Sequence, residues 1–505
     1  MQLIEKALNE QKSSILLVPE ISLTPQTVNR FIARFGKDQI AVLHSKLSVG
    51  ERYDEWQKIN SGKAKIVIGA RSAIFAPVKD LGIVIIDEEH DSSYKSEMAP
   101  RFDARDIARY LCKEANIPLV LGSATPDLDS FYRAKKEEVM LLELKKRANE
   151  ADLPEIEVID LREELAKGNK SMLSTRLYTE IEKNLQDKKQ TILYLNRRGF
   201  STFVMCRNCG YTVKCKNCNI NLTYHVNTNK LKCHYCGYEE KLVTICPECG
   251  SKQIRYFGTG TQKLEYEINK LFPNASTIRM DVDTVSKKNS HEQILDKFRN
   301  ENIDILIGTQ MVVKGHHFPN VTLVGVIAAD GSLNIDDFRA NEKTFQILTQ
   351  VAGRAGRGQN KGRVIIQTYN PDNFSIECAK KQDYELFYQT EIALRKQLKY
   401  PPFCDIILMG FSSSNQQEVI KVAEKIHSYL KNRVIKENIG IILYKAVPSP
   451  IDRIKNKFRW RILIKCIFSE EIIDLMNDAL KEYDRLKCKD TRVVIDVNPS
   501  NMMTL

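Results

Sequence analysis

Leu81-Gly82-Ile83-Val84-Ile85-Ile86-Asp87-Glu88-Glu89-His90 is the stretch that decides the fold. Ile83 to Ile86 is an uninterrupted β-branched run. Strands of a parallel sheet are apolar in this way because helices cover both of their faces. Three carboxylates and a histidine follow at once, and in open α/β sheets the chemistry lies at the carboxyl ends of the strands. The stretch therefore predicts a buried strand that ends in a magnesium and water site, with Asp87 on the metal and Glu88 orienting or deprotonating the water. The alternative is a helix N-cap with extra acids, which a helix N-terminus also favours.

The composition is typical of a soluble globular protein with several domains. Its 505 residues suffice for three or four domains, and 43% of them are apolar and 28% charged. No apolar run approaches the roughly 18 residues that a membrane helix needs. Met1 to Glu10 carries charges that a secretion signal lacks, so we expect a cytoplasmic protein. The net charge of +12, from 76 Lys+Arg and 64 Asp+Glu, mildly favours a polyanionic partner.

Strands alternate with helices over most of the chain, which predicts an α/β architecture with parallel sheets. The first series runs from residue 13 to residue 121 and has expected strands at 14–18, 39–43, 64–68, 83–86 and 119–121. The second has expected strands at 191–195, 276–279, 303–307, 322–328 and 362–367. The tail follows a β-α-β-β-α-β order, which predicts a ferredoxin-like α+β domain with strands at 405–411, 441–446, 459–465 and 492–497.

A block of cysteines interrupts the second series. Eight of the thirteen cysteines form four CxxC pairs, and in a large chain without a signal peptide such packing indicates metal and not disulfides. Eight thiolates suffice for two closed four-cysteine zinc sites. Fourteen residues, the length of a hairpin, separate the second pair from the third, so we assign one site to Cys215, Cys218, Cys233 and Cys236. The other site is then Cys206, Cys209, Cys246 and Cys249. Pairing each CxxC with its neighbour along the chain is the alternative.

Two further motifs follow expected strands. Ser123-Ala124-Thr125 can connect a nucleotide site to a neighbouring lobe, although a strand-to-helix turn with Thr125 as N-cap also explains it. Gln350 to Arg357 places Arg354 and Arg357 three residues apart, on one face if the segment is helical. Gly353 and Gly356 weaken such a helix by about 1 kcal/mol each. Two arginines on a closely approached backbone suit a phosphate.

Together these motifs have the order and spacing of a superfamily 2 helicase. The stretches at 17–26, 69–77 and 336–342, and the cysteine block, resemble more closely the primosomal protein N′ family of bacterial replication-restart helicases. The resemblance covers essentially the whole chain. It implies two RecA-like lobes, a zinc-binding insert in the second lobe and a C-terminal α+β domain. It also implies an ATP-driven 3′→5′ DNA helicase that uses Mg and two Zn ions, binds abandoned forks and helps to reload the replicative helicase.

The resemblance also implies partners and domain bounds. The expected partners are forked and single-stranded DNA, other primosome proteins and single-stranded DNA-binding protein. We expect the first lobe at 1–150, the second at 151–202 and 253–372, the insert at 203–252 and the C-terminal domain at 373–505. The nested pairing of the cysteines resembles the arrangement in the family.

The roles implied by the resemblance fall on matching positions. Asp87 and Glu88 would be catalytic, together with Arg354 and Arg357, of which Arg357 is the expected arginine finger. His90, Ser123, Thr125 and Gln350 would bind nucleotide or couple the lobes. DNA contacts would come from Thr309 and Lys314, from Arg71 and Ser72, and from the aromatic-rich loop with Tyr94, Lys95, Arg101, Phe102 and Arg105.

The chain departs from the family pattern in three places. His317 replaces an acid, which puts a ligand role there in doubt, and Asp103 replaces a histidine, which would weaken the DNA contact of its loop. No Gly-x-x-x-x-Gly-Lys-Ser/Thr phosphate loop occurs in the 505 residues. We expect the chain to begin just past that loop, to hydrolyse ATP poorly, and to lack a central strand beside 83–86. The rival to the helicase is a zinc-stabilised DNA-binding scaffold without hydrolysis.

Overall fold

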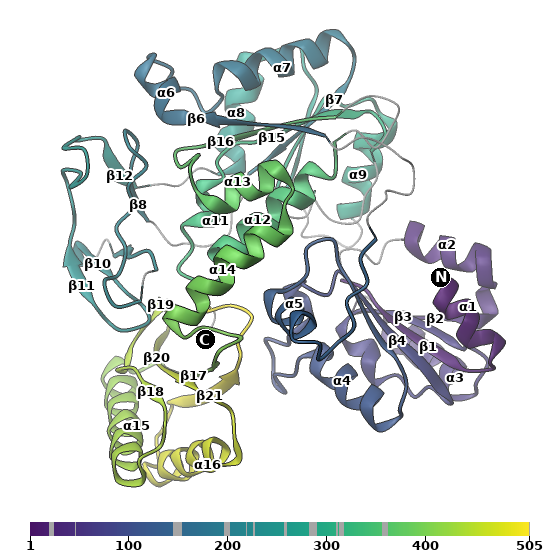
Figure 1. Cartoon of the computed structure of the whole chain (residues 1–505), viewed down its shortest axis with the longest axis vertical. Coiled ribbons are helices and arrows are strands. Elements are labelled where there is room, and N and C mark those ends of the chain that lie inside the picture. The colour runs from purple at the N-terminus through teal and green to yellow at the C-terminus, as the bar shows by residue number, and fades with distance from the viewer. Residues whose placement is uncertain are drawn as a thin grey trace. The chain divides into compact units, whose positions relative to one another are not determined.

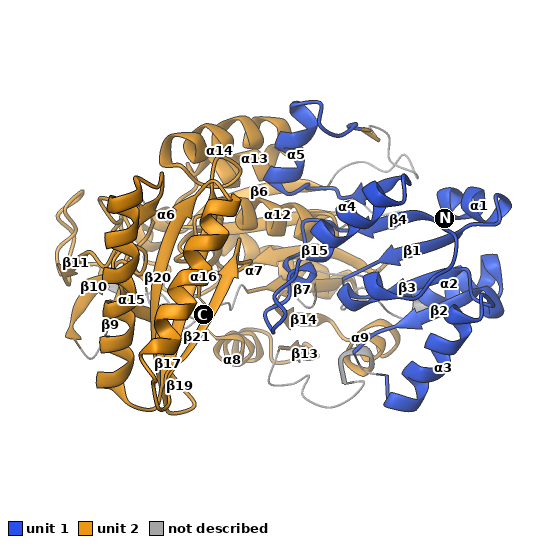
Figure 2. Ribbon diagram, turned by 90° about the horizontal axis from the view of Figure 1, so that it is seen from below, with its two compact units in different colours: residues 1–141, 314–316 blue, residues 142–313, 317–505 orange. Residues whose placement is uncertain are grey.

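The computed structural model describes the chain at residues 1–19, 25–45, 47–144, 154–195, 203–218, 220–225, 228–256, 260–281, 290–309, 312, 318–355 and 362–503. These residues form two compact units, the first within residues 1–141 and the second within residues 142–505 (Figure 2). No helix among the described residues has the length and apolar character needed to cross a membrane.

Unit 1 is a parallel five-stranded sheet with helices on both faces. Its strand order is β2-β3-β1-β4-β5, with β1 at Ser13–Leu17, β2 at Ile40–Leu43, β3 at Ile66–Gly69, β4 at Leu81–Asp87 and β5 at Leu119–Gly122. The helices are α1 Gln2–Asn9, α2 Pro25–Phe35, α3 Val49–Asn60, α4 Ala104–Glu114 and α5 Leu128–Lys135. Short 3-10 turns lie at Arg71–Phe75 (η3) and Ser92–Tyr94 (η4).

The strand that decides the fold is fully paired. β4 hydrogen-bonds to β1 on one side and to β5 on the other, both in parallel register. The expectation of a gap beside residues 83–86 is therefore wrong, because neighbouring strands of the same chain occupy both edges of β4. The edges of this sheet are β2 and β5.

Unit 2 contains a second parallel sheet, of six strands in the order β13-β14-β7-β15-β16-β6 (Figure 1). The strands are β6 Glu155–Asp160, β7 Gln190–Tyr194, β13 Thr277–Met280, β14 Ile305–Gly308, β15 Val321–Val326 and β16 Arg363–Thr368. Its helices include α6 Leu161–Ala166, α7 Thr175–Gln186, α8 Thr261–Leu271, α9 Ser290–Asn300, α11 Asp330–Leu333, α12 Ala340–Ala352, α13 Phe374–Lys381 and α14 Tyr384–Leu398. β6 was not predicted, because acids interrupt its apolar pattern and it is an edge strand.

The cysteine block folds into two small antiparallel sheets between β7 and α8. One pairs β8 (Val204–Cys206) with β12 (Ile254–Tyr256). The other has the order β11-β10-β9, from β9 Thr223–His225, β10 Lys230–Lys232 and β11 Glu239–Lys241. The predicted insertion into the second α/β series is confirmed, since α8 and β13 continue that series afterwards.

The tail forms the predicted ferredoxin-like sheet, with one correction. The order is β18-β20-β17-β21, all antiparallel, with α15 (Gln416–Glu437) and α16 (Glu470–Arg485) between strands. The strands are β17 Asp405–Ser413, β18 Ile442–Leu443, β20 Lys457–Cys466 and β21 Arg492–Val497. The strand expected at 441–446 shrinks to two residues, and β19 (Val447–Ile454) pairs with β20 as an edge strand. Its two prolines explain why it is at an edge.

The C-terminal sheet is buried on both faces, by different partners. Ile407, Met409 and Phe411 of β17 pack with α15 and α16. Ile406 and Leu408, which alternate with them, share a core with the cysteines of the insert and with Tyr235. Successive side chains of a strand point to opposite faces. The cysteine insert therefore covers the face of the C-terminal sheet that its own helices leave open.

Segment 336–342 lies where the insert, the second sheet and the C-terminal domain meet. The ring of Phe338 stacks on that of Tyr400 at 4.7 Å between centroids, with 2° between their planes. The backbone N–H of Phe338 donates to Tyr235 Oη at 3.3 Å, and Tyr400 Oη donates to the carbonyl of Cys218 at 3.3 Å. We call Tyr235, Asp336, Phe338, Tyr400 and Arg461 the junction.

Arg461 is the buried cation of the junction. It is fully buried, donates Nε and Nη2 to the carbonyl of His234 at 3.0 and 2.6 Å, and donates Nη1 to the carbonyl of Met502. Burial raises the pKa of Asp336 to about 7, and the charge of Arg461 opposes this shift. Neither carboxylate oxygen of Asp336 has a hydrogen-bond partner, so the cation is its main electrostatic compensation.

We predict that Arg461→Met destabilises unit 2 by about 3–5 kcal/mol, because it leaves two carbonyls without their donor and Asp336 without its cation. Arg453→Met, which removes an exposed arginine of the same sheet, should cost less than about 0.5 kcal/mol. Urea unfolding followed by Trp460 fluorescence in a Trp56→Phe background measures both. Equal midpoints for the two variants would show that the buried arginine contributes no stability.

Candidate functional site

Asp87 and Glu88 lie at the carboxyl end of β4, as predicted. The Asp87 side chain is exposed, and Glu88 follows in a left-handed turn with φ of 46°. Glu88 N donates to Asp87 Oδ1 at 3.0 Å. Partial desolvation of the carboxylate by the surrounding protein raises the pKa of Asp87, and this hydrogen bond opposes the shift. Asp87 thus presents an oriented carboxylate at the carboxyl end of the parallel strands, where a magnesium ligand is expected.

His90 and Ser123 connect the ends of β4 and β5. His90 Nδ1 lies 2.7 Å from Ser123 Oγ and 3.7 Å from a carboxylate oxygen of Glu88. The same hydroxyl accepts a hydrogen bond from Thr125 N at 3.0 Å. A change at Glu88 therefore has a direct route, through His90, to the turn that holds Ser123 and Thr125. The coupling role of these residues stays a prediction, although the structure brings them together.

Glu89 has a structural role that sequence reasoning missed. It is 1% exposed and accepts hydrogen bonds from Asp127 N at 2.6 Å and from Ser130 Oγ at 3.0 Å. It therefore fixes the start of α5 to the end of β4. Burial, and then the charge of Asp127, raise the pKa of Glu89 to about 7. The third acid of the motif is a positioning group, which its place in the acid box did not distinguish.

The predicted DNA contacts of the aromatic-rich loop need correction at three residues. Tyr94 is fully buried, and its hydroxyl donates to the carbonyls of Asp87 at 2.6 Å and Leu17 at 3.2 Å, so it cannot stack on a base. Lys95 is 7% exposed and donates to the carbonyl of Arg101 at 3.2 Å. Arg105 binds Asp103 through Nε and Nη2 at 3.0 and 2.7 Å. Asp103, which replaces the histidine usual in the family, thus pairs with the Arg105 guanidinium that was predicted to bind phosphate.

The remaining predicted contacts of unit 1 lie closer to solvent. Arg71 donates Nη1 to the carbonyls of Ser93 at 3.2 Å and Lys95 at 2.7 Å, and its guanidinium lies 5.7 Å from the centre of the Phe102 ring. Ser72 is exposed, and Arg101 and Phe102 are half-buried. These four residues keep their predicted DNA-binding roles as proposals.

The arginine motif of unit 2 is not one helix. α12 ends at Ala352 with Gly353 as its C-cap, so Arg354 follows the helix instead of continuing it. Arg354 is therefore not on the predicted helix, because α12 is capped at Gly353 before reaching it. The predicted face that it would share with Arg357 stays a prediction. Gln350 is in the last turn of α12, and both it and Arg354 are half-buried. Thr309 follows β14. Arg357, Lys314 and His317 lie outside the described residues.

The eight cysteines form the two predicted clusters. Cys215, Cys218, Cys233 and Cys236 make the inner cluster, and Cys206, Cys209, Cys246 and Cys249 the outer one. Within each, the sulfur atoms lie within 4.8 Å of one another. The nested pairing is confirmed and the sequential alternative is wrong. Gly210, Gly237 and Gly250, each directly after a CxxC pair, adopt the left-handed conformation that the tight turn requires.

The clusters fit a tetrahedral metal. Sulfurs on a zinc ion at about 2.3 Å would be roughly 3.8 Å apart. The pairs Cys206–Cys249, Cys209–Cys246 and Cys215–Cys236 are separated by 3.7, 3.5 and 3.5 Å. A disulfide is about 2.05 Å long, so these are free thiols at the separation of metal ligands and not disulfides.

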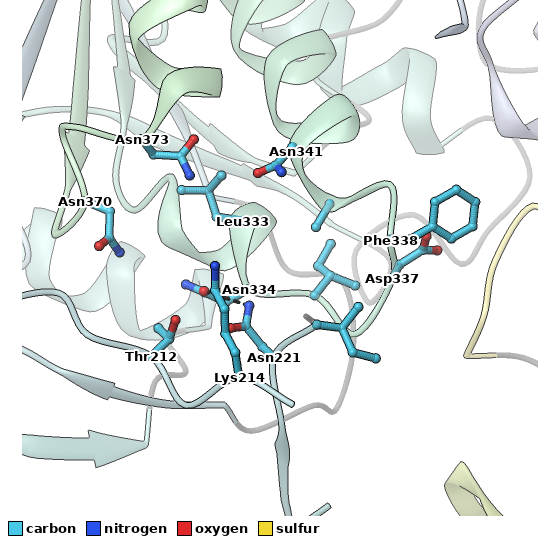
Figure 3. Close-up of a pocket in the computed structure, with 13 residues that line it drawn as sticks. Thr212, Lys214, Asn221, Leu333, Asn334, Asp337, Phe338, Asn341, Asn370 and Asn373 are labelled. Carbon is cyan, nitrogen blue, oxygen red and sulfur yellow. Dashed lines mark hydrogen bonds between the residues drawn. The ribbon is translucent and has the colours of Figure 1, made fainter. Parts of the chain in front are cut away.

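A polar cavity of about 140 Å³ lies between the insert and segment 333–341 (Figure 3). Its amide side chains are mostly bonded to the wall itself. Asn221 donates to Asn334 at 3.0 Å, Asn334 to the carbonyl of Asp330 at 2.9 Å, and Asn370 to Asp330 Oδ1 at 3.0 Å. The cavity is thus a hydrogen-bonded seam beside the junction, and we assign no ligand to it.

Models of known families match four parts of the chain. DEAD/DEAH box helicase matches residues 1–133, and the helicase conserved C-terminal domain matches 240–359. The PriA DNA helicase Cys-rich region domain matches 215–241, and the primosomal protein N C-terminal domain matches 396–500.

Curated relatives match along the whole chain. Replication restart protein PriA of Bacillus subtilis is 50% identical over 506 residues, which are 100% of this chain and 62% of the relative. The Synechocystis protein of the same name is 43% identical over 92% of this chain and 57% of its own length. The Treponema pallidum protein is 41% identical over 99% of this chain and 74% of its own length. The chain spans less than two thirds of the first two. With this identity, the acid box on β4 and the two tetracysteine clusters, the chain belongs to the PriA replication restart family.

Proposed function

We propose that the chain supplies the motor lobes and the zinc-supported scaffold of an ATP-driven 3′→5′ DNA helicase that restarts replication. The observation that carries the proposal is the network from Asp87 and Glu88 through His90 to Ser123 and Thr125. A carboxylate for magnesium, an acid for water and a hydrogen-bonded route out of the site are the parts that phosphoryl transfer requires. A scaffold without hydrolysis has no use for this arrangement.

Each residue has a proposed part in the reaction. Asp87 would hold Mg²⁺ and Glu88 would orient or deprotonate the attacking water. Gln350, Arg354 and Arg357 would contact the phosphates and stabilise the charge that develops during transfer, with Arg357 as the finger. Thr309 and Lys314 would contact DNA. Asp87 and Glu88 stand on a rigid strand end, which favours a reproducible geometry for the metal and the water.

The 505 residues contain no phosphate loop, and this favours weak hydrolysis by the chain alone. The loop lysine binds the β- and γ-phosphates, and its Ser/Thr shares the magnesium ion. Without these groups, Asp87 would hold the metal from one side only. The same absence supports the second candidate, a non-hydrolysing zinc-stabilised DNA-binding scaffold.

Steady-state ATP hydrolysis with forked DNA separates the two candidates. We predict little turnover above background for the 505-residue chain alone. Fusion to the part of the B. subtilis relative that the chain does not match should restore DNA-stimulated turnover, and Glu88→Gln in the fusion should abolish it. A fusion that binds forked DNA but remains inactive would favour the scaffold. Glu88-dependent turnover by the unfused chain would show that the phosphate loop is dispensable here.

The partners we propose are polyanionic and replicative. Forked and single-stranded DNA would bind through backbone phosphates and base faces, so affinity should depend little on sequence and fall with salt. Other primosome proteins and single-stranded DNA-binding protein are proposed partners from the family. The proposed location is the cytoplasm.

We propose that each tetracysteine cluster holds one zinc ion. The four sulfurs of each cluster lie within 4.8 Å of one another, and structural four-cysteine zinc sites are closed to other ligands. Such an ion contributes to folding, because the unfolded chain does not preform the site.

Metal analysis of purified protein should find about two zinc ions per chain, one for each cluster. Cys215→Ser should lower this to about one ion, and so should Cys249→Ser in the other cluster. Cys112→Ser is the control, because Cys112 is a buried cysteine in neither cluster, and it should leave the zinc content unchanged. Loss of both ions from either cluster variant would show a single shared site instead of two.

A further inference from the structure

Phe75 is exposed although the residues before it are buried. It ends η3, where Ala73 is fully buried and Ile74 is 2% exposed, yet Phe75 itself is 57% exposed. Exposing an aromatic ring is unfavourable, because burial of such a side chain contributes about 1.5–3 kcal/mol. The 3-10 turn buries Ala73 and Ile74 and leaves the ring of Phe75 on the surface of unit 1.

Phe102 holds the exposed ring in one orientation. The two centroids are 4.9 Å apart with 72° between the planes, an edge-to-face pair. Phe102 is itself fixed, since its N–H donates to the carbonyl of Pro100 at 3.0 Å and its carbonyl accepts from Ser96 N at 2.7 Å. A ring held from its edge needs little further ordering to receive a second aromatic surface.

The surroundings of the two rings favour an anionic partner. Arg71 is held beside Phe102 by the carbonyls of Ser93 and Lys95. In loop 93–103, Asp103 is already paired with Arg105, which leaves Glu97 as the exposed acid against Arg101, since Lys95 is buried. Two aromatic rings with the held guanidinium of Arg71 beside them match a base and its phosphate. Protein docking sites usually need an apolar patch of several hundred Å².

We propose that Phe75 is a stacking residue that receives one base of single-stranded DNA, with Phe102 as its support. This deepens the proposed function and rests on the DNA contact proposed there. No local pattern indicates this role, because Phe75 stands in an apolar run that is typical of a core segment. Base stacking on an aromatic side chain is tolerant of sequence, as a helicase requires.

The test compares Phe75→Ala with the unmodified chain for binding to oligothymidine and to a matched oligomer with abasic residues. Loss of one stacked base corresponds to an affinity lower by roughly 5- to 150-fold on intact DNA. On abasic DNA the variant and the unmodified chain should bind equally, because no base remains to stack. Phe75→Trp should keep the affinity. Tyr110→Ala removes another exposed aromatic, on α4 and 64% exposed, and should change neither binding curve.

The outcomes separate this inference from the proposal on which it rests. If the unmodified chain does not bind single-stranded DNA, the DNA contact itself is wrong and this inference falls with it. If it binds and Phe75→Ala binds intact DNA equally well, only the stacking role is wrong. Equal losses on intact and abasic DNA would show that Phe75 acts on the loop and not on a base.

Discussion

The packing of Phe338 on Tyr400, beside the buried guanidinium of Arg461, is the constraint on which unit 2 depends. Arg461 donates to the carbonyl of His234, which lies between Cys233 and Cys236 of the inner cluster, and to the carbonyl of Met502. Tyr400 donates to the carbonyl of Cys218. The insert, Phe338 of segment 336–342 and the C-terminal sheet therefore share one core. A buried cation is tolerated only where its donors are satisfied. A shift of the insert or of the C-terminal sheet would expose the Arg461 guanidinium.

Through this arrangement, the inner cysteine cluster also positions residues that are not its ligands. Tyr235 stands between Cys233 and Cys236, so the turn that orients two thiolates also positions the partner of Phe338. Segment 336–342 leads directly into α12, whose last turn carries Gln350. The proposed zinc ion would thus fix the start of the helix that ends at the proposed phosphate contacts. The outer cluster, with Cys249 exposed, has only Cys206 on a strand, at the end of β8, and has no junction residue within its CxxC pairs.

Features encoded locally were predictable and long-range ones were not. The run 83–86, the CxxC spacing and the alternation of the tail lie within short windows, and the strands and clusters follow them. The resemblance places Tyr94 in the aromatic-rich loop that contacts DNA, yet its hydroxyl donates to carbonyls of two strands. Arg461 and His234 are 227 residues apart, and no local pattern indicates their contact. Arg354 would share a helical face with Arg357 only if the segment were helical, but α12 is capped at Gly353, before Arg354.

Hydrogen exchange on two variants, each with one cysteine replaced by serine, tests most directly whether the inner cluster holds the C-terminal domain in place. Cys215→Ser should speed exchange of β20 and of residues 398–404, because loss of that site loosens Tyr235 and with it the seat of Tyr400 and Arg461. Cys249→Ser, which removes a ligand of the outer cluster, should leave β20 protected, and neither should change exchange in β1 or β4 of unit 1. If β20 stays fully protected in Cys215→Ser after its zinc is lost, the C-terminal domain does not depend on the inner cluster and this account is wrong.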